Sequence, residues 1–151
     1  MNMLVDIGNG TMSILEIHDG RPMENSISTE VFGVHQCMEK IQKEVSKHSG
    51  VEVPEMLIEP LLRNGIGDRT DAVAMTTKRI AENYTAEIMK KLIAHGYREE
   101  LVHLYIIDGG GCLLQNFSDL TAKPEVTVIT DICANAKGYE ALAMMKQRMR
   151  G

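Results

Sequence analysis

The sequence contains no tryptophan, four tyrosines, two phenylalanines and only three cysteines, Cys37, Cys112 and Cys133, which lie far apart. This cysteine spacing excludes the usual zinc motifs, and an odd number of thiols fits the reducing environment of a cytoplasm. No apolar run reaches the roughly 18 residues of a membrane-spanning helix, and the opening Met1-Asn2-Met3 lacks the basic start of a secretory signal. These absences predict a cytoplasmic protein without a membrane segment.

Charge and length limit the protein further. The 151 residues include 16 basic and 21 acidic side chains, a net charge of −5, which argues against a broad nucleic-acid-binding surface. The apolar fraction of 44% and the charged fraction of 25% are typical of a soluble globular domain. At this length we expect one domain, residues 1–151, that is large enough to bury a core.

The first strand and the turn after it, LVDIGNGT (residues 4–11), organise the rest of the chain. Glycines allow backbone N–H groups to approach a phosphate closely. A carboxylate at the end of a strand, such as Asp6, can hold a hydrated divalent metal beside that phosphate. Gly-x-Gly also occurs in ordinary hairpins, so a purely structural turn is the alternative interpretation.

The next segments predict an antiparallel meander followed by a helix. Residues 12–17 form the second strand, Asp19-Gly20 is a hairpin signal, and residues 27–32 form the third strand, with alternate side chains on one face. After Gly33, apolar residues recur at the spacing of one buried helical stripe, and Gly50 ends this helix. The stripe residues are Val34, Met38, Ile41 and Val45.

Residues 51–70 are the least regular part, and we expect an inserted short helix or a pair of turns at the edge of the fold; they are either a simple connector or a partner surface. The longest helix is expected from Asp71 to about residue 95, capped by Thr70 or Asp71. Its core stripe is Val73, Ile80, Tyr84, Ile88 and Leu92.

LVHLYII (residues 101–107) is a nearly continuous apolar run, typical of a strand buried on both faces. It leads into three consecutive glycines, whose entropic cost indicates a close approach of the backbone to a ligand or to another part of the fold. A short helix over residues 113–117 would direct its N-terminal dipole at this turn. A last strand (residues 125–130) and a last helix from about residue 134 complete the chain.

This order, βββ-α-(insert)-α-β-β-α, predicts an α/β fold. Strand–helix–strand crossovers place strands in parallel, whereas the opening meander is antiparallel, so we expect a five-stranded mixed sheet with helices packed on it.

Three segments in this order resemble the motifs of actin-like ATPases. VDIGNGT (residues 5–11) resembles their second phosphate-binding motif, and IIDGGG (residues 106–111) resembles their adenosine motif. ICANAKGY (residues 132–139) resembles the closing helix of the bacterial plasmid-segregation actins, the ParM/StbA group. The match covers almost the whole chain and is weakest over residues 51–70. It implies a ribonuclease-H-like domain, the C-terminal half of such an ATPase.

The resemblance also implies a ligand, ATP or ADP with Mg²⁺, and a role for each matching residue. The implied residues are Asp6 for Mg²⁺ through water, Gly8, Asn9, Gly10 and Thr11 for the phosphates, and Gly109, Gly110 and Gly111 for the adenosine side. Two residues depart from the family pattern. Asn9 stands where a glycine is common, although asparagine tolerates positive φ, and Cys112 stands where a small alanine is common.

The resemblance implies that an N-terminal ATPase domain, which carries the first phosphate motif, is absent from this chain, because the second motif begins at residue 4. The isolated chain is therefore expected to bind ATP weakly and to lack catalytic residues of its own, whereas the full-length protein would form filaments. Those filaments would move plasmid DNA through a DNA-bound adaptor, with no direct contact to nucleic acid or membrane.

Two alternatives remain open from the sequence. The chain could belong to another ATPase or kinase of the same superfamily, such as a sugar kinase or a chaperone ATPase. It could also be a non-catalytic interaction module in which the glycine turns are purely structural.

Overall fold

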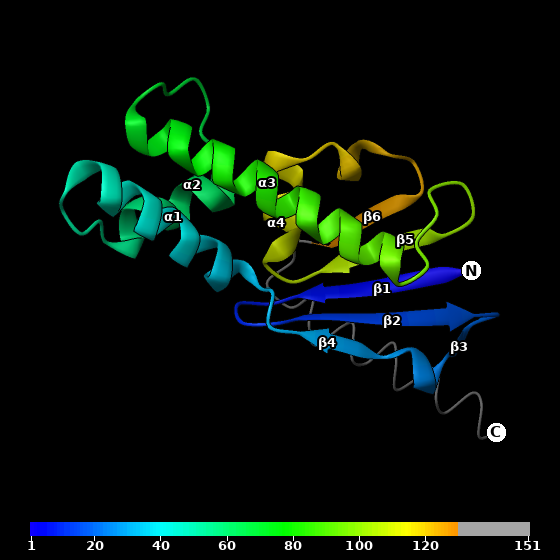
Figure 1. Cartoon of the computed structure of the whole chain (residues 1–151). Helices are drawn as coiled ribbons and strands as arrows, with labels where there is room; N and C mark the ends of the chain where they lie inside the picture. Colours follow the sequence, from blue (N-terminus) through cyan, green and yellow to red (C-terminus); the bar gives the residue numbers. More distant parts are fainter. Residues whose placement is uncertain (130–151) are drawn as a thin grey trace.

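The computed structural model describes residues 1–129. Strand β1 (Asn2–Ile7) is central in a mixed sheet of the order β3-β2-β1-β5-β6 (Figure 1). β2 (Met12–His18) pairs with β1 antiparallel, whereas β5 (His103–Ile107) pairs with β1 in parallel. β6 (Val126–Ile129) is parallel to β5. The expected mixed sheet is therefore confirmed.

The outer edge of the sheet differs in detail from the expectation. Asp19 and Gly20, with φ of 50° and 73°, turn the chain from β2 into β3 (Arg21–Pro22), a two-residue strand that raises the strand number to six. A short 3₁₀ turn, η1 (Glu24–Ser26), then leads to β4 (Ser28–Glu30), which also pairs with β2. β4 is shorter than the strand expected over residues 27–32, and Ile27 and Val31, which flank it, are 61% and 74% exposed.

Helix α1 (Val34–Ser49) confirms the expected stripe, since Met38, Ile41 and Val45 are buried. Gly50 ends the helix in the left-handed region, with φ of 71°. The inserted segment contains α2 (Glu55–Asn64), whose Ile58 is fully buried in the core. The insert is therefore a helix that contributes to the core as well as connecting α1 to α3.

Helix α3 (Ala72–Ala94) is the longest helix, and the Asp71 side chain accepts a hydrogen bond from the Ala74 N–H at its start. Tyr84, Ile88 and Leu92 are buried, as the stripe predicts. α3 packs over the sheet face that carries Val5 and Ile7, and α1 lies beside the first half of α3, beyond the end of the strands (Figure 1).

Helix α4 (Gly110–Phe117) begins three residues earlier than the expected residues 113–117. Gly110 and Gly111 therefore form its first turn and are buried, and the glycine run is not the open loop that the sequence indicated. A 3₁₀ turn, η2 (Leu120–Ala122), joins α4 to β6.

Several sequence predictions lie outside the described residues: the last helix, the segment of residues 132–139 and Cys133. Within residues 1–129, no helix has both the length and the apolar character needed to cross a membrane.

Candidate functional site

The two glycine turns lie side by side, because they follow neighbouring parallel strands. Asp6 in β1 is in register with Ile107 in β5, so both strands end at the same edge of the sheet. A Cβ atom on Gly110 would lie 2.2 Å from the Cβ of Ile7, closer than any two such atoms can approach. The turn that resembles a phosphate motif and the turn that resembles an adenosine motif therefore lie at one edge of the sheet.

The first turn is held from one side by the start of α1. The Val34 N–H donates to the Gly8 carbonyl at 3.0 Å, and the His35 N–H donates to the Asn9 carbonyl at 2.7 Å. These are amides of the first helical turn, which have no partner inside the helix. In a trans peptide the N–H points opposite to the C=O of the same unit. The N–H groups of Asn9 and Gly10 therefore point away from α1, at exposed positions.

Gly33 makes this arrangement possible. A Cβ atom there would lie 2.5 Å from the Asn9 carbonyl oxygen and 2.6 Å from that of Gly8. The Gly33 N–H also donates to the Gln36 Oε1 at 2.8 Å. The sequence indicated Gly33 only as a helix boundary, although a glycine directly before a helix is also a signal of close backbone contact.

Asn9 does not use the tolerance for positive φ that was expected of it. Among the described non-glycine residues, only Asp19 and Asp108 have positive φ. Gly10 has no heavy atom within 4 Å of the position that its Cβ would occupy. The first turn therefore has an open outer surface at Gly10.

Two carboxylates meet between the turns, Asp6 at the end of β1 and Asp108 directly after β5. Burial raises the pKa of Asp6 to about 6, and the negative charge of Asp108 and a hydrogen bond with it contribute in the same direction. The Oδ1 atom of Asp6 is buried and has no hydrogen-bond partner within the described part of the chain. A buried, unpartnered carboxylate oxygen is a position that a cation would stabilise.

Asp108 shapes the second turn with a φ of 73°, a conformation that few non-glycine residues adopt. Its Oδ1 accepts from the Gly109 N–H at 2.9 Å, and its carbonyl accepts from the Gly111 N–H at 3.1 Å. Asp108 was not among the site residues that the sequence indicated. A signal was present, because Asp6 stands at the end of one strand and Asp108 directly after another, and the carboxyl ends of the two strands meet.

The three glycines of the second turn have different surroundings. Gly109 is exposed and its missing Cβ would touch only the Val34 side chain, at 3.9 Å. Gly110 and Gly111 are buried. Gly109 is therefore the glycine of this turn that a ligand could reach.

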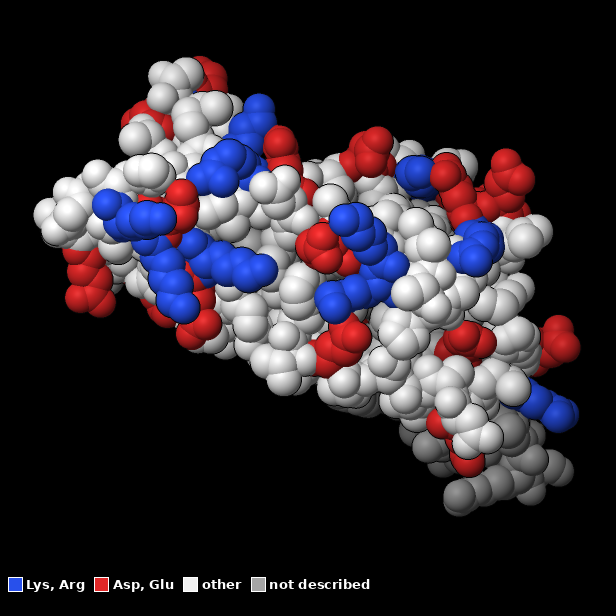
Figure 2. All heavy atoms as spheres, viewed as in Figure 1, with Lys and Arg blue, Asp and Glu red and all other residues white. Residues whose placement is uncertain are grey.

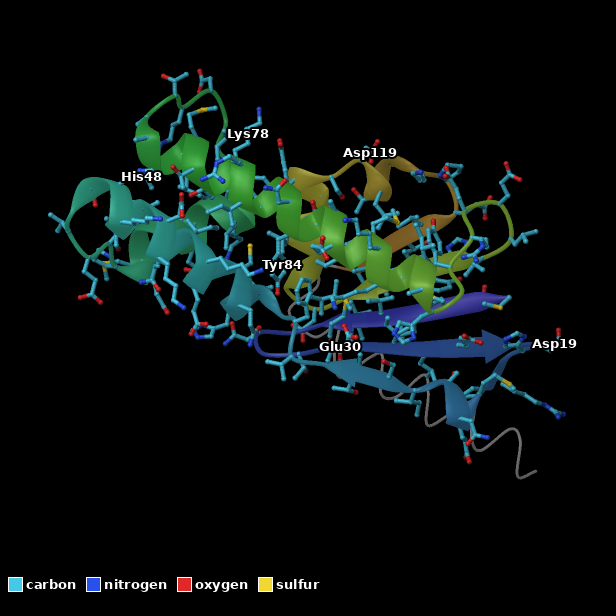
Figure 3. All side chains as sticks on the ribbon, in the orientation of Figure 1. Asp19, Glu30, His48, Lys78, Tyr84 and Asp119 are labelled. Atoms are coloured by element: carbon cyan, nitrogen blue, oxygen red, sulfur yellow. The ribbon has the colours of Figure 1, made fainter. Side chains whose placement is uncertain are left out.

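Tyr84 links α3 to the first turn. Its hydroxyl donates to the Gly33 carbonyl at 2.7 Å, and its ring stacks on Phe32 with a centroid distance of 4.1 Å. In Figure 3, Tyr84 lies between α3 and the chain segment that enters α1. The helical spacing predicted only a core position for this tyrosine.

A groove of about 370 Å³ lies between α1 and α3, and neither glycine turn contributes to it. Lys40, Lys43 and Arg79 line it together with Glu44 and Glu87. Basic and acidic side chains alternate over this face in Figure 2. The groove is therefore distinct from the two glycine turns, and the side chains that line it carry charges of both signs.

Residues 1–129 contain no cluster of three or more histidine, cysteine, aspartate or glutamate side chains that could hold a metal by themselves. The pair of Asp6 and Asp108 is consistent with Mg²⁺, which is commonly held by one or two carboxylates together with phosphate oxygens and water. The site thus fits a metal that arrives with an anionic ligand.

A family model described as "Archaeal actin homologue MreB-like, C-terminal" matches residues 4–118, which include both glycine turns. A search of curated proteins with the sequence gave no match.

Solved structures of actin homologues have the same fold. The archaeal actin homologue Ta0583 superimposes with a TM-score of 0.70 at 18% identity, over 99% of this chain and 48% of that protein. A non-polymerisable quadruple mutant of pCBH ParM gives 0.69 at 21% identity, over 97% and 46%. Bacillus thuringiensis ParM with ATP gives 0.66 at 13% identity, over 99% and 47%.

This chain thus spans about half the length of the solved structures that it resembles. The mixed sheet, its covering helices and these superpositions establish a ribonuclease-H-like, actin-like fold. Since the family model covers most of the sequence, the chain belongs to the family of C-terminal domains of archaeal, MreB-like actin homologues.

Proposed function

We propose that this chain is the nucleotide-binding half of an actin-like ATPase and that ATP or ADP with Mg²⁺ binds where the two glycine turns meet. The observation that carries the proposal is the contact between Gly110 and Ile7, which brings the ends of β1 and β5 together. Ligands of open α/β sheets bind at the carboxyl ends of the strands.

The phosphates would lie against Gly8, Asn9, Gly10 and Thr11. The N–H groups of Asn9 and Gly10 support this role because α1 binds the carbonyls of the same turn and directs those N–H groups outward. The open space at Gly10 would allow a phosphate oxygen to approach the backbone. The Thr11 hydroxyl is at an exposed position beside them.

Asp6 would hold Mg²⁺ through water, as the family resemblance implies, at its unpartnered Oδ1. The ion would neutralise charge on the phosphates and on the two carboxylates, and phosphoryl transfer depends mainly on such positioning and neutralisation. On the adenosine side, Gly109 would contact the nucleotide, whereas Gly110 would place the turn by packing against Ile7 of β1 and Gly111 is buried in the first turn of α4.

The activity of the whole protein is a broader proposal. Structures related to this fold include Ta0583 in complex with ADP and Bacillus thuringiensis ParM with ATP. Both are about twice as long as this chain. We therefore expect hydrolysis to require a second domain, in the same protein or in a partner, and the isolated chain to bind weakly and hydrolyse negligibly.

Self-association into filaments and the movement of plasmid DNA through an adaptor form a narrower hypothesis. Its sequence support came from residues 132–139, which lie outside both the family match and the described residues. An archaeal actin homologue and a ParM superimpose almost equally well. Nucleotide-dependent pelleting of the full-length protein would support a filament-forming ATPase, whereas a kinase of the same superfamily should stay in solution.

The binding proposal is tested by calorimetry with Mg-ATP on the wild type, on Thr11→Val and on Thr70→Val. Both threonines are exposed, but Thr70 lies far along the chain in the loop before α3. We expect saturable binding that Thr11→Val weakens and Thr70→Val leaves unchanged. Absence of heat with the wild type would instead support the non-catalytic interaction module.

A further inference from the structure

Tyr84 and Thr85 are consecutive residues of α3, each 2% exposed, whose hydroxyls contact the segments that follow or hold the two glycine turns. Tyr84 Oη donates to the carbonyl of Gly33, directly before α1. Thr85 Oγ1 lies 3.0 Å from the carbonyl of Phe117, the last residue of α4, and 2.9 Å from the Glu82 carbonyl within α3. One point on α3 therefore contacts the elements behind both glycine turns.

The path from Tyr84 to the first turn is short. Gly33 accepts the tyrosine hydroxyl, and the next two residues, Val34 and His35, donate their N–H groups to the carbonyls of Gly8 and Asn9. A Cβ on Gly33 would collide with those same carbonyls, so the backbone of Gly33 is in direct contact with the first turn. A displacement of Gly33 would therefore move the turn itself.

Further contacts fix the same junction to α3. Phe32 stacks on Tyr84 with an interplanar angle of 3°. The Lys91 ammonium lies 4.7 Å from the Phe32 ring centroid and 2.9 Å from the Glu30 carboxylate. Residues 30–33 are thus bound to α3 by aromatic and ionic contacts as well as by the Tyr84 hydrogen bond.

The path from Thr85 to the second turn runs along α4. This helix has eight residues, a length of about 12 Å, and connects the Thr85 contact to the turn. Thr85 contacts its last residue, while its first residue, Gly110, packs against Ile7. Fixing the far end of α4 therefore limits how α4 can tilt at the turn.

We propose that Tyr84 and Thr85 are positioning residues that hold the two glycine turns at the separation one nucleotide requires. Tyr84 acts on residues 8–10 through Gly33, and Thr85 acts on residues 109–111 through α4. This inference rests on the proposed function, because it concerns the same nucleotide site.

The chain offers matched controls for both residues. Tyr97 and Thr77 are also buried, but their hydroxyl oxygens have no hydrogen-bond partner within residues 1–129. Tyr84→Phe and Tyr97→Phe therefore remove the same group from a bonded and an unbonded position. Thr85→Val and Thr77→Val form the equivalent pair.

The experiment measures two quantities on all four variants and the wild-type chain: affinity for Mg-ATP, and amide hydrogen exchange without nucleotide. We expect Tyr84→Phe to weaken binding about fivefold and Thr85→Val about threefold, the effect of one lost hydrogen bond. Tyr97→Phe and Thr77→Val should stay within about twofold of the wild type.

Hydrogen exchange separates positioning from a general loss of stability. Tyr84→Phe should speed exchange at the amides of Val34 and His35, whereas Thr85→Val should speed it at those of Gly111 and Cys112. Equal acceleration throughout the chain, or affinity changes no larger than in the two controls, would overturn the inference. If the wild type binds no nucleotide, the proposed function fails, and the exchange pattern still decides whether these hydroxyls hold the two turns.

Discussion

Gly110 packs against Ile7 so closely that a Cβ atom on Gly110 would lie 2.2 Å from the Ile7 Cβ and 2.3 Å from its Cγ2. This contact joins the first turn of α4 to the end of β1. It explains one glycine of the run at residues 109–111 by packing, and it brings the exposed Gly109 close to the first turn. Gly110 therefore packs against the fold, whereas the neighbouring Gly109 is left accessible to a ligand.

Gly110→Ala should lower the free energy of unfolding by about 2 kcal/mol, because the added methyl group overpacks against Ile7. Alanine is otherwise the better helix former, so the loss would occur despite a favourable propensity. Urea unfolding monitored by circular dichroism measures it. The control is Gly10→Ala, where no heavy atom lies within 4 Å and φ is not positive. Equal stability of the two variants would contradict the packing described.

The pKa of Asp6 should be about 6 in the folded protein, since burial and the nearby Asp108 disfavour its charged form. Asp108→Asn should lower this pKa but leave it above the ordinary value of 3.8, because burial is the larger cause. Titration of the side-chain carboxyl carbon by NMR measures both values. An Asp6 pKa near 3.8 in the wild type would contradict its burial, and an unchanged pKa in Asp108→Asn would show that the two carboxylates do not meet.

The same shift sets a direction for stability. Between pH 3.8 and about 6 the folded state binds more protons at Asp6 than the unfolded state does. Protonation of Asp6 therefore stabilises the fold fully below pH 3.8, and this stabilisation is lost as the pH rises through about 6. In Asp6→Asn this part of the pH dependence should disappear. Chemical unfolding at a series of pH values compares the two proteins.

Asp71→Ala should lower the midpoint of thermal unfolding by about 2–4 °C, because the side chain caps α3 through the Ala74 N–H. Asp71→Asn should retain most of the cap.

The Arg69 guanidinium, and then the Ala74 N–H, lower the pKa of Asp71 to about 2. Its charge-dependent stabilisation is therefore present above pH 3.8 and lost as the pH falls through about 2. Asp71→Asn should lack that acid dependence, and an unchanged acid dependence would exclude this ion pair as its source.

Much of the fold could be predicted from local patterns. The spacing of Met38, Ile41 and Val45 predicted α1, Gly50 predicted its end, and Asp19-Gly20 predicted the hairpin. These signals depend on residues close in sequence, whose geometry is set by helical and turn periodicity. That the two turns lie together was implied by the resemblance of residues 5–11 and 106–111 to two motifs of one nucleotide site, and the pairing of β1 with β5 agrees with it.

The remaining features depend on contacts between distant segments. The Tyr84 hydrogen bond to Gly33 joins residues 51 positions apart, and no local pattern distinguishes it from an ordinary core tyrosine. The start of α4 within the glycine run was wrong in the prediction, because glycine disfavours helices by itself. Tertiary packing against Ile7 overrides that preference. The pairing of Asp108 with Asp6 was missed for the same reason, since it requires the register of β1 and β5.

An NMR titration of the chain with Mg-ATP tests whether both turns bind a single nucleotide. The amide signals of Asn9, Gly10 and Gly109 should shift together and fit one dissociation constant, while the amide of Gly67, in the loop after α2, should not move. Shifts confined to one turn, or two different dissociation constants for the two turns, would contradict the claim.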